Sequence, residues 1–448
     1  MISNSTVTRM ANNNGGTLPP ASRRELLSWA LYDFANSGYT TVVLTTIYSA
    51  YFVAVVAGGL PGLEGGEGTF IWTLAVSLAN LIVLLSAPLV GAMADHRAMK
   101  KRFLLLSTLG CVAATALLAV VGPGDVWLGA ALLVLSAVFF YTGENLVAAF
   151  LPEIVSSGRM GRMSGYGWGL GYAGGLLTLA ICLGYITWAK GQGQTESQFV
   201  PVTLLITAVI FALAATPVFL WLRERATASP RGQASYLRQA YGRLRRTLAE
   251  AARHRDLFHF LIALVVYQSG ISTVIVLTAI YAREVVGFDS QSLVMLVMVV
   301  NVTAAVGALI FGPLQDRFGS VPSLASTLVI WCVAIFLAYG AEAPADIWLA
   351  GNLIGLAMGA SQAGGRALIG KFTPQARSAE FFGLWGMINR IAAIAGPLSY
   401  GLISYLSGGD HRLAILSVLV FFIAGLVILL GVNEKRGMVA AAGERSLP

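Results

Sequence analysis

The sequence predicts an all-α membrane protein of twelve transmembrane helices, arranged as two six-helix halves around a central cavity. Three observations support this fold class: the composition, the length of the apolar segments, and a motif that occurs once in each half. Of the 448 residues, 56% are hydrophobic and only 11% are charged. Soluble domains carry roughly 25% charged residues, so this chain has too little polar surface to cover a soluble core, and the bilayer is its expected partner.

Twelve apolar stretches reach or approach the roughly 20 helical residues that cross a bilayer core. They lie near residues 26–57, 70–93, 103–122, 126–150, 163–187, 199–222, 257–283, 290–313, 321–340, 346–370, 382–406 and 412–432. Backbone groups in hydrocarbon must pair internally, and the alternating pattern of barrel strands is missing. Each stretch is therefore predicted to be a helix.

The basic residues predict the orientation of these helices. An even number of crossings places both termini on one side of the membrane. With the N-terminus inside, all Lys and Arg residues lie on inner segments, apart from a few exceptions. The exceptions are Lys190, Arg283 and Arg412 in outer loops, and Arg366 and Arg390 within helices. Both termini are therefore predicted to be cytoplasmic. The short loops suit a bacterial inner (plasma) membrane.

The helices divide the chain into an N-terminal half, 26–222, and a C-terminal half, 257–432. Cytoplasmic tails are expected at 1–25, which is polar and predicted to be disordered, and at 433–448. The basic linker 223–256 separates the halves, and its apolar residues recur at helical spacing. That spacing indicates an amphipathic helix on the inner membrane surface, although a soluble linker is equally compatible. Because the excess positive charge follows the topology, no nucleic-acid partner is expected.

A short motif marks the same place in both halves. Gly91-Ala-Met-Ala-Asp95-His-Arg97 follows the second helix, and Gly312-Pro-Leu-Gln-Asp316-Arg317 follows the eighth. Transporters are commonly built from internal repeats, so a match at equivalent places favours a transporter.

The first copy, which a run of basic residues follows, resembles the signature loop of the major facilitator superfamily. This resemblance implies a conformational latch at the cytoplasmic ends of the helices. Its predicted residues are Gly91, Asp95, Arg97, Gly312, Asp316 and Arg317. Glycine permits a tight turn, aspartate can accept hydrogen bonds at a helix end, and arginine can pair with a carboxylate. The second copy lacks the trailing basic run, so its latch is expected to be weaker.

Longer segments narrow the resemblance. Ser28-Trp-Ala-Leu-Tyr-Asp33-Phe-Ala-Asn36-Ser37, Leu151-Pro-Glu153, residues 165–175 and the stretch from Pro374 to Trp385 resemble the vacuole-effluxer-like branch of the superfamily. That branch is related to the fungal autophagy-linked amino-acid effluxer. The resemblance implies a secondary active transporter that moves a small polar solute, with amino acids as the leading candidate, by alternating access. A proton is the expected coupling ion.

Polar residues inside apolar helices independently mark a site, because ionisable groups are costly in a membrane. The candidates lie on the first, fourth, seventh, tenth and eleventh helices, the first four of which line the cavity in the superfamily. They are Asp33, Asn36, Ser37, Tyr141, Glu144, Asn145, Gln268, Gln362, Arg366, Asn389 and Arg390.

Two hypotheses remain open for the charged members, all of which lie in the cytoplasmic half of the membrane. In one, Asp33 or Glu144 takes a coupling proton and Arg366 binds a substrate carboxylate. In the other, acid–arginine pairs form an inner gate that closes in one state and breaks in the other. An adjacent arginine keeps a carboxylate ionised, and the sequence does not say which carboxylate lacks one.

Other classes of chemistry find little support. No phosphate-binding G-x-x-x-x-G-K-[ST] loop is present, the four histidines lack ligand spacing for zinc, and the three cysteines lie far apart in apolar segments. We therefore expect no enzymatic activity, cofactor or metal, and a monomeric protein. The alternatives are a membrane sensor or scaffold, or a lipid-handling protein, on the same fold.

Overall fold

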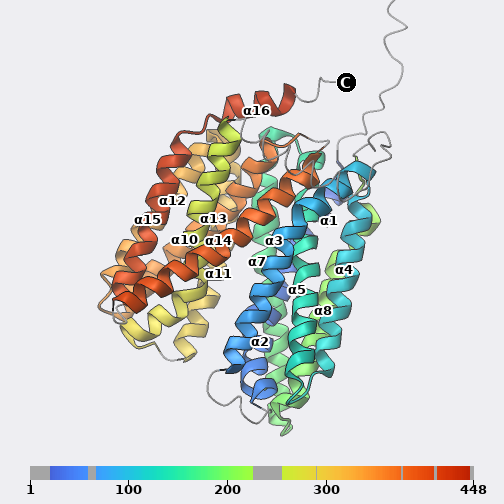
Figure 1. Cartoon of the computed structure of the whole chain (residues 1–448), viewed down its shortest axis with the longest axis vertical. Helices are drawn as coiled ribbons and strands as arrows, with labels where there is room; N and C mark the ends of the chain where they lie inside the picture. Colours follow the sequence, from blue (N-terminus) through green and yellow to red (C-terminus); the bar gives the residue numbers. More distant parts are fainter. Residues whose placement is uncertain are drawn as a thin grey trace, which may run out of the picture.

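The computed structural model describes residues 21–58, 67–225, 255–288, 290–374, 377–407 and 411–443, and these residues form helices and their connections without a strand. Most of the predicted N-terminal tail, and the linker residues 226–254 with the predicted amphipathic helix, lie outside the described residues. Figure 1 shows two helical bundles side by side, one built from α1 to α8 and the other from α10 to α15.

The first bundle contains the six predicted N-terminal spans. Its elements are α1 (Arg23–Tyr39), η1 (Thr40–Thr46), α2 (Ile47–Tyr51), η2 (Phe52–Ala57), α3 (Glu67–Arg97), α4 (Lys100–Leu117), η3 (Leu118–Val120), α5 (Val126–Ala148), α6 (Leu151–Ile154), η4 (Ser157–Arg159), α7 (Met160–Gly191) and α8 (Glu196–Trp221). The segments α1 to η2 together make the first span.

The second bundle contains the remaining six spans. Its elements are α10 (Arg255–Val286), α11 (Ser290–Phe318), α12 (Ser320–Tyr339), α13 (Pro344–Lys371), α14 (Ser378–Leu406) and α15 (His411–Leu430). A further helix, α16 (Glu434–Gly443), follows α15. The predicted tail 433–448 therefore begins with an ordered element.

The helices have the length and surface of membrane spans. Among the described residues, eleven helical segments are long and apolar enough to cross a bilayer. The twelfth, α13, has 28 residues, and polar residues such as Asn352, Gln362 and Arg366 dilute its apolar character. Large apolar side chains such as Leu85 and Leu398 are 60% and 70% exposed. Lipid is the solvent that such a surface requires, so the chain is an integral membrane protein.

The first span changes its helical geometry halfway. It begins with a capping box in which the Ser22 and Glu25 side chains each accept a hydrogen bond from the other's backbone N–H. Beyond Tyr39 the helix widens into two π-helical stretches, η1 and η2. There the Thr45 hydroxyl donates to the carbonyl of Thr41. Such hydroxyls satisfy carbonyls that the wider helix leaves free.

The two bundles approach each other at one end, which carries α16, and diverge towards the opposite end (Figure 1). We call the first of these the α16 end. Hydrogen bonds join the bundles there: the Glu380 N–H donates to Asp95 at 2.8 Å, and the Gly161 N–H donates to Asp316 at 2.8 Å.

Glycine makes this approach possible at one crossing in particular. A Cβ atom on Gly91 of α3 would lie 2.2 Å from the carbonyl oxygen of Ala379 on α14. That distance is far inside van der Waals contact, so only glycine fits at this position while the halves are together.

Candidate functional site

A buried ion pair joins the two halves, from Asp33 on α1 to Arg366 in the last third of α13. The Arg366 Nη1 atom lies 2.7 Å from Asp33 Oδ2. Asp33 is 7% exposed and Arg366 is 3% exposed. Among the described residues, Asp33 forms an ion pair with Arg366 alone. The carboxylate comes from the first half and the guanidinium from the second, so this contact depends on how the halves are placed.

The Arg366 guanidinium is held from three further directions by residues of the first half. Its Nε and Nη2 atoms donate to the hydroxyl and the carbonyl of Ser164 on α7, both at 3.0 Å. Its Cζ atom lies 4.8 Å from the ring centre of Trp29 and 5.4 Å from that of Trp168. Cation–π contact and charge-assisted hydrogen bonds compensate for the loss of water around the charge. The arginine is therefore fixed in position and orientation.

A second acid–arginine pair also crosses between the halves, from α5 to α14. Arg390 Nη2 lies 3.8 Å from Glu144 Oε2, and Nη1 donates to Asn80 Oδ1 on α3 at 3.0 Å. The Arg390 Cζ atom sits 3.8 Å from the ring centre of Tyr141. This pair is looser than the first, since the Glu144 side chain is 25% exposed. Both arginines are thus paired, and the two pairs together carry no net charge.

Several polar atoms near these pairs are buried without a hydrogen-bond partner among the described residues. They include Asn36 Oδ1, one helical turn from Asp33, and Trp168 Nε1, on the indole that stacks on Arg366. The first is an acceptor and the second is a donor. Buried polar groups are normally satisfied, so unsatisfied ones of both kinds beside an ion pair are typical of a site that receives a polar ligand.

The other predicted site residues lie outside the two ion pairs, on the same four helices and on α10. Ser37 packs beside Gly171 of α7, and Asn145 packs closely against Gly386 of α14. Gln268 on α10 is 7% exposed. Gln362 on α13 and Asn389 on α14 are partly buried. None of the five bonds to either arginine in the part of the chain that the structure describes.

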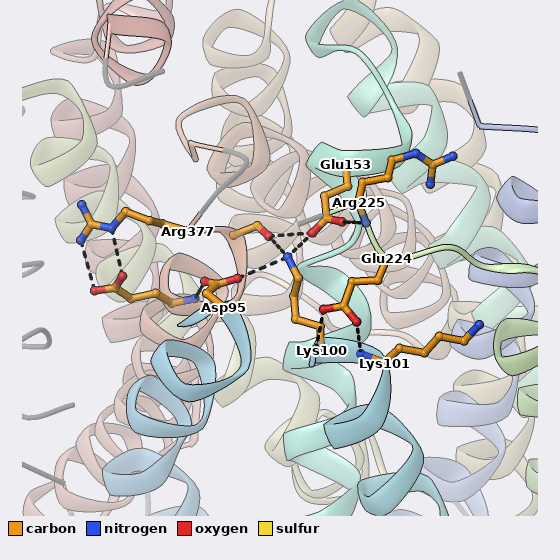
Figure 2. Close-up of polar contacts among 9 residues, drawn as sticks. Asp95, Lys100, Lys101, Glu153, Glu224, Arg225 and Arg377 are labelled. Atoms are coloured by element: carbon orange, nitrogen blue, oxygen red, sulfur yellow. Dashed lines mark hydrogen bonds and ion pairs between the residues drawn. The ribbon is translucent and has the colours of Figure 1, made fainter. Parts of the chain in front are cut away.

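Figure 2 shows the polar contacts around Asp95, the acidic member of the first latch. Asp95 accepts a hydrogen bond from the N–H of Glu380, at the first turn of α14. It also lies 3.2 Å from the ammonium group of Lys100, which is fully buried. That ammonium in turn contacts Glu153 and donates to the hydroxyl of Ser378 at 2.8 Å. A carboxylate at a helix N-terminus is favoured by the exposed N–H groups and the helix dipole, so Asp95 ties the halves together.

The second latch follows the same plan with the halves exchanged. Asp316 of the second half accepts hydrogen bonds from the N–H groups of Gly161 and Arg162, both 2.8 Å long, at the start of α7. A Cβ on Gly312 would lie 2.7 Å from the carbonyl oxygen of Gly161. Arg317 is exposed and stacks on Phe318. The side chain of Arg97, the predicted basic member of the first latch, lies outside the described residues.

Sequence reasoning missed several partners of these residues. Asn80 is an intramembrane polar residue, and the high cost of such residues could have identified it. Ser164 and Trp168 lie four residues apart and therefore share one face of α7. Their shared face was a weak signal, because nothing in the sequence places it against α13.

Comparison with known proteins also indicates a membrane transporter. The family model described as "Vacuole effluxer Atg22 like" matches residues 69–160 and 157–442. An uncharacterised MFS-type transporter of Bacillus subtilis, YxiO, is 28% identical over 424 residues, which cover 94% of this chain and 97% of that protein. Autophagy-related protein 22-1 of Neosartorya fischeri is 25% identical over 312 residues, which cover 63% of this chain and 50% of the fungal protein.

Solved structures share the fold at low sequence identity. The human organic anion transporter MFSD10 aligns with a TM-score of 0.70 at 15% identity, over 92% of this chain and 100% of that one. The proton:xylose symporter XylE aligns with a TM-score of 0.69 at 16% identity, over 92% of this chain and 96% of that one. The Escherichia coli fucose:proton symporter FucP aligns with a TM-score of 0.69 at 15% identity, over 91% and 98% of the two chains. These likenesses confirm the predicted twelve-helix, two-half fold.

Proposed function

Because this chain belongs to the vacuole effluxer Atg22-like family of major facilitator transporters, we propose that it carries amino acids across the membrane by alternating access with proton coupling. The single observation that carries the proposal is the Asp33–Arg366 pair, with its unsatisfied neighbours. An amino acid is a zwitterion. Its carboxylate can replace Asp33 on the guanidinium, and its ammonium group can pair with the Asp33 carboxylate that is released.

An ion pair without net charge suits a zwitterion, because the two charges of the zwitterion can replace the two partners in the pair. Removing one member of a buried ion pair leaves the other uncompensated, which costs about 3–5 kcal/mol. A solute with only one charge would leave Asp33 or Arg366 in that position. A zwitterion satisfies both, and the donor on Trp168 and the acceptor on Asn36 add one contact of each kind. Uncharged sugars offer neither replacement.

Proton coupling enters through Asp33 in this proposal. A proton on Asp33 would open the internal pair and leave Arg366 available to the substrate carboxylate. The proton would leave again as the substrate ammonium group pairs with the Asp33 carboxylate, so substrate and proton would bind in exchange. Release of the substrate would restore the internal pair. The proton symporters XylE and FucP, which share the fold, support proton coupling on such a scaffold.

The second pair and the latches are assigned to the gate. Glu144–Arg390, Asp95 and Asp316 all make contacts from one half to the other. Every one of these contacts must break if the α16 end opens. We therefore propose that the substrate binds at Asp33 and Arg366, and that the second ion pair and the two latches close the α16 end. This assignment combines the two hypotheses that the sequence left open.

The proposal also includes an orientation and a membrane. The distribution of basic residues supports a cytoplasmic location for the α16 end under the positive-inside rule. With that end closed, the described state would be open to the outside. The bacterial relative YxiO matches over almost its whole length, whereas the fungal relative matches over half. A bacterial plasma membrane is therefore the proposed location.

Thermal stabilisation of the purified protein tests the choice of cargo. The panel should contain amino acids, their methyl esters, their N-acetyl derivatives, dipeptides and sugars, each at pH 5.5 and 7.5. We expect stabilisation by one class of free amino acid, and loss of the effect when either charge is blocked. Equal stabilisation by a methyl ester, or stabilisation by a sugar alone, would contradict a zwitterion site.

The alternative functions lack an observation in their favour. A lipid-handling protein would need its polar groove on the lipid-facing surface, yet Asp33 and Arg366 lie buried between the halves. A sensor or scaffold has no need for a charge-balanced pair in that position.

A further inference from the structure

The residues that follow the last helix of each half fold back onto that half. After α8, the Glu224 carboxylate accepts hydrogen bonds from the N–H groups of Lys100 and Lys101, at 2.6 and 3.3 Å (Figure 2). After α15, the Glu434 carboxylate accepts them from the N–H groups of Ser320 and Val321, at 2.5 and 3.4 Å. Each glutamate thus caps the N-terminus of the third helix of its own half, α4 or α12.

The two halves differ in the origin of their buried cation. In the first half, Lys100 is the first residue of α4 and contacts Asp95 directly. The first residue of α12 is Ser320 instead. The cation there is Lys371, at the end of α13, which donates to the Ser320 hydroxyl at 2.8 Å and to Glu434 at 2.9 Å. The cation that the second motif lacks in sequence is therefore supplied from another helix.

Glu434 is the anion that holds this second cluster together. It accepts four hydrogen bonds from three residues: the N–H and hydroxyl of Ser320, the N–H of Val321 and the ammonium group of Lys371. The Lys371 side chain is only 5% exposed and that of Glu434 is 16% exposed. Without this carboxylate, a buried ammonium group would lose its counter-ion and two N–H groups would lose their acceptor, which buried polar groups rarely tolerate.

We propose that the C-terminal helix α16 is a working part of the second latch, and that Glu434 controls closure of the α16 end through Ser320 and Lys371. This inference rests on the alternating access of the proposed function. The link is a short turn: Asp316 reaches α7 of the other half, and Ser320, four residues later, is fixed by Glu434. Gly319 lies between them with a φ of 98°, a conformation that favours glycine. Release of Ser320 frees the turn that aims Asp316.

A second contact of α16 provides a matched control. Arg436 binds Asp256 at the start of α10, with hydrogen bonds of 2.5 and 2.7 Å. This pair anchors the same helix but touches neither Ser320 nor Lys371. A variant at Asp256 therefore loosens α16 without removing the anion of the latch.

Distances between spin labels at the two ends of the molecule test the proposal. In a background without the three native cysteines, one pair of labels replaces exposed Arg102 and Arg255 at the α16 end. A second pair replaces exposed Lys190 and Glu342 at the opposite end. We expect Glu434→Gln to raise severalfold the population with a long Arg102–Arg255 distance, and to shorten the Lys190–Glu342 distance to match. Asp256→Asn should leave both distributions close to those of the unmodified protein.

The outcomes separate this inference from the proposed function. If the unmodified protein exchanges between two states and Glu434→Gln leaves their ratio unchanged, α16 has no part in the latch. If the unmodified protein shows one fixed distance at each end, whatever ligand or pH is used, alternating access itself fails. Should Glu434→Gln not fold, Ser320→Ala, which removes only the bridging hydroxyl, must shift the same ratio in the same direction. An unchanged ratio in that variant would also overturn the proposal.

Discussion

Arg366 illustrates how a single charge is retained in the membrane-spanning part of this protein. Its guanidinium contacts a carboxylate, a hydroxyl, a carbonyl and two indole rings. These partners come from α1 and α7 of the opposite half. A planar group with several donors in a fixed arrangement can use all of them at once, whereas an ammonium group cannot.

The substitution Arg366→Lys tests whether this geometry serves substrate binding. It keeps the charge but loses the fork and the stacking on Trp29 and Trp168. A hydrogen bond to a charged group contributes about 1.5–3 kcal/mol, so the apparent affinity should fall by roughly tenfold or more. The dependence of uptake into proteoliposomes on substrate concentration measures this affinity. The control is Arg102→Lys, at an exposed position. An unchanged KM with a reduced turnover would instead assign Arg366 to the gate.

The sequence predicted the individual site residues better than it predicted their contacts. Asp33, Glu144, Arg366 and Arg390 could be identified because charges inside apolar helices are rare. Which acid meets which arginine could not, because each pair joins helices far apart in the chain. The neighbours of the Asp33–Arg366 pair are ordinary residues for a helix, such as Ser164, and only the packing of α7 against α13 gives them a role.

The crossing of α3 and α14 can be tested with a substitution that destabilises only the state in which the α16 end is closed. A methyl group on Gly91 would meet the Ala379 carbonyl of the other half. Overpacking typically costs about 1–3 kcal/mol, and here only the state with the α16 end closed bears that cost. Gly91→Ala should therefore shift the protein towards the state with that end open.

Labelling of a single cysteine at the α16 end with a membrane-impermeant thiol reagent measures this shift. Gly184→Ala on α7, where no atom lies within 4 Å of an added Cβ, is the matched control. Equal labelling rates for the Gly91 and Gly184 variants would show that this crossing does not open.

The junction of α16 with α12 and α13 predicts a pH dependence of stability. Burial alone would raise the pKa of the Glu434 carboxyl, but the Lys371 charge and the hydrogen bonds from Lys371 and Ser320 outweigh it and hold the pKa below its ordinary value of 4.5. Its charge therefore stabilises the fold above about pH 4.5, and this contribution is lost as the pH falls through the lowered pKa.

Thermal unfolding of Glu434→Gln at several pH values measures this contribution. The variant should be less stable than the unmodified protein at pH 7, by on the order of 1–3 kcal/mol. The difference should shrink as the pH falls below 4.5. A difference that stays constant down to pH 3.5 would mean that the ionised carboxylate is not what stabilises the junction.

The elements themselves were largely predictable, since length and hydrophobicity decide where a chain crosses a bilayer. The bounds of α3 and α8, for example, lie within a few residues of the predicted ranges. The π-helical stretches after Tyr39 were not predicted, because their widening depends on contacts with neighbouring helices. The helix α16 was not predicted either, since its short sequence is ordered by Glu434 and Arg436 docking onto the second half.

For the whole molecule, the internal repeat in the sequence indicated two halves, and the structure shows how the repeat is used. Asp95 and Asp316 each cap a helix of the opposite half, so the two motifs act in a reciprocal way. The sequence could not show which end is closed, because states of a transporter differ by only a few kcal/mol. Contacts between the halves decide that, and these lie at the α16 end.

The most direct test of the account is amino-acid flux into proteoliposomes, with and without a pH gradient, for the unmodified protein and for Asp33→Asn. We expect a gradient to drive accumulation by the unmodified protein. We expect Asp33→Asn, although folded and inserted, to lose gradient-driven accumulation. Gradient-driven accumulation by Asp33→Asn at the unmodified rate would contradict the role of Asp33 as the coupling site.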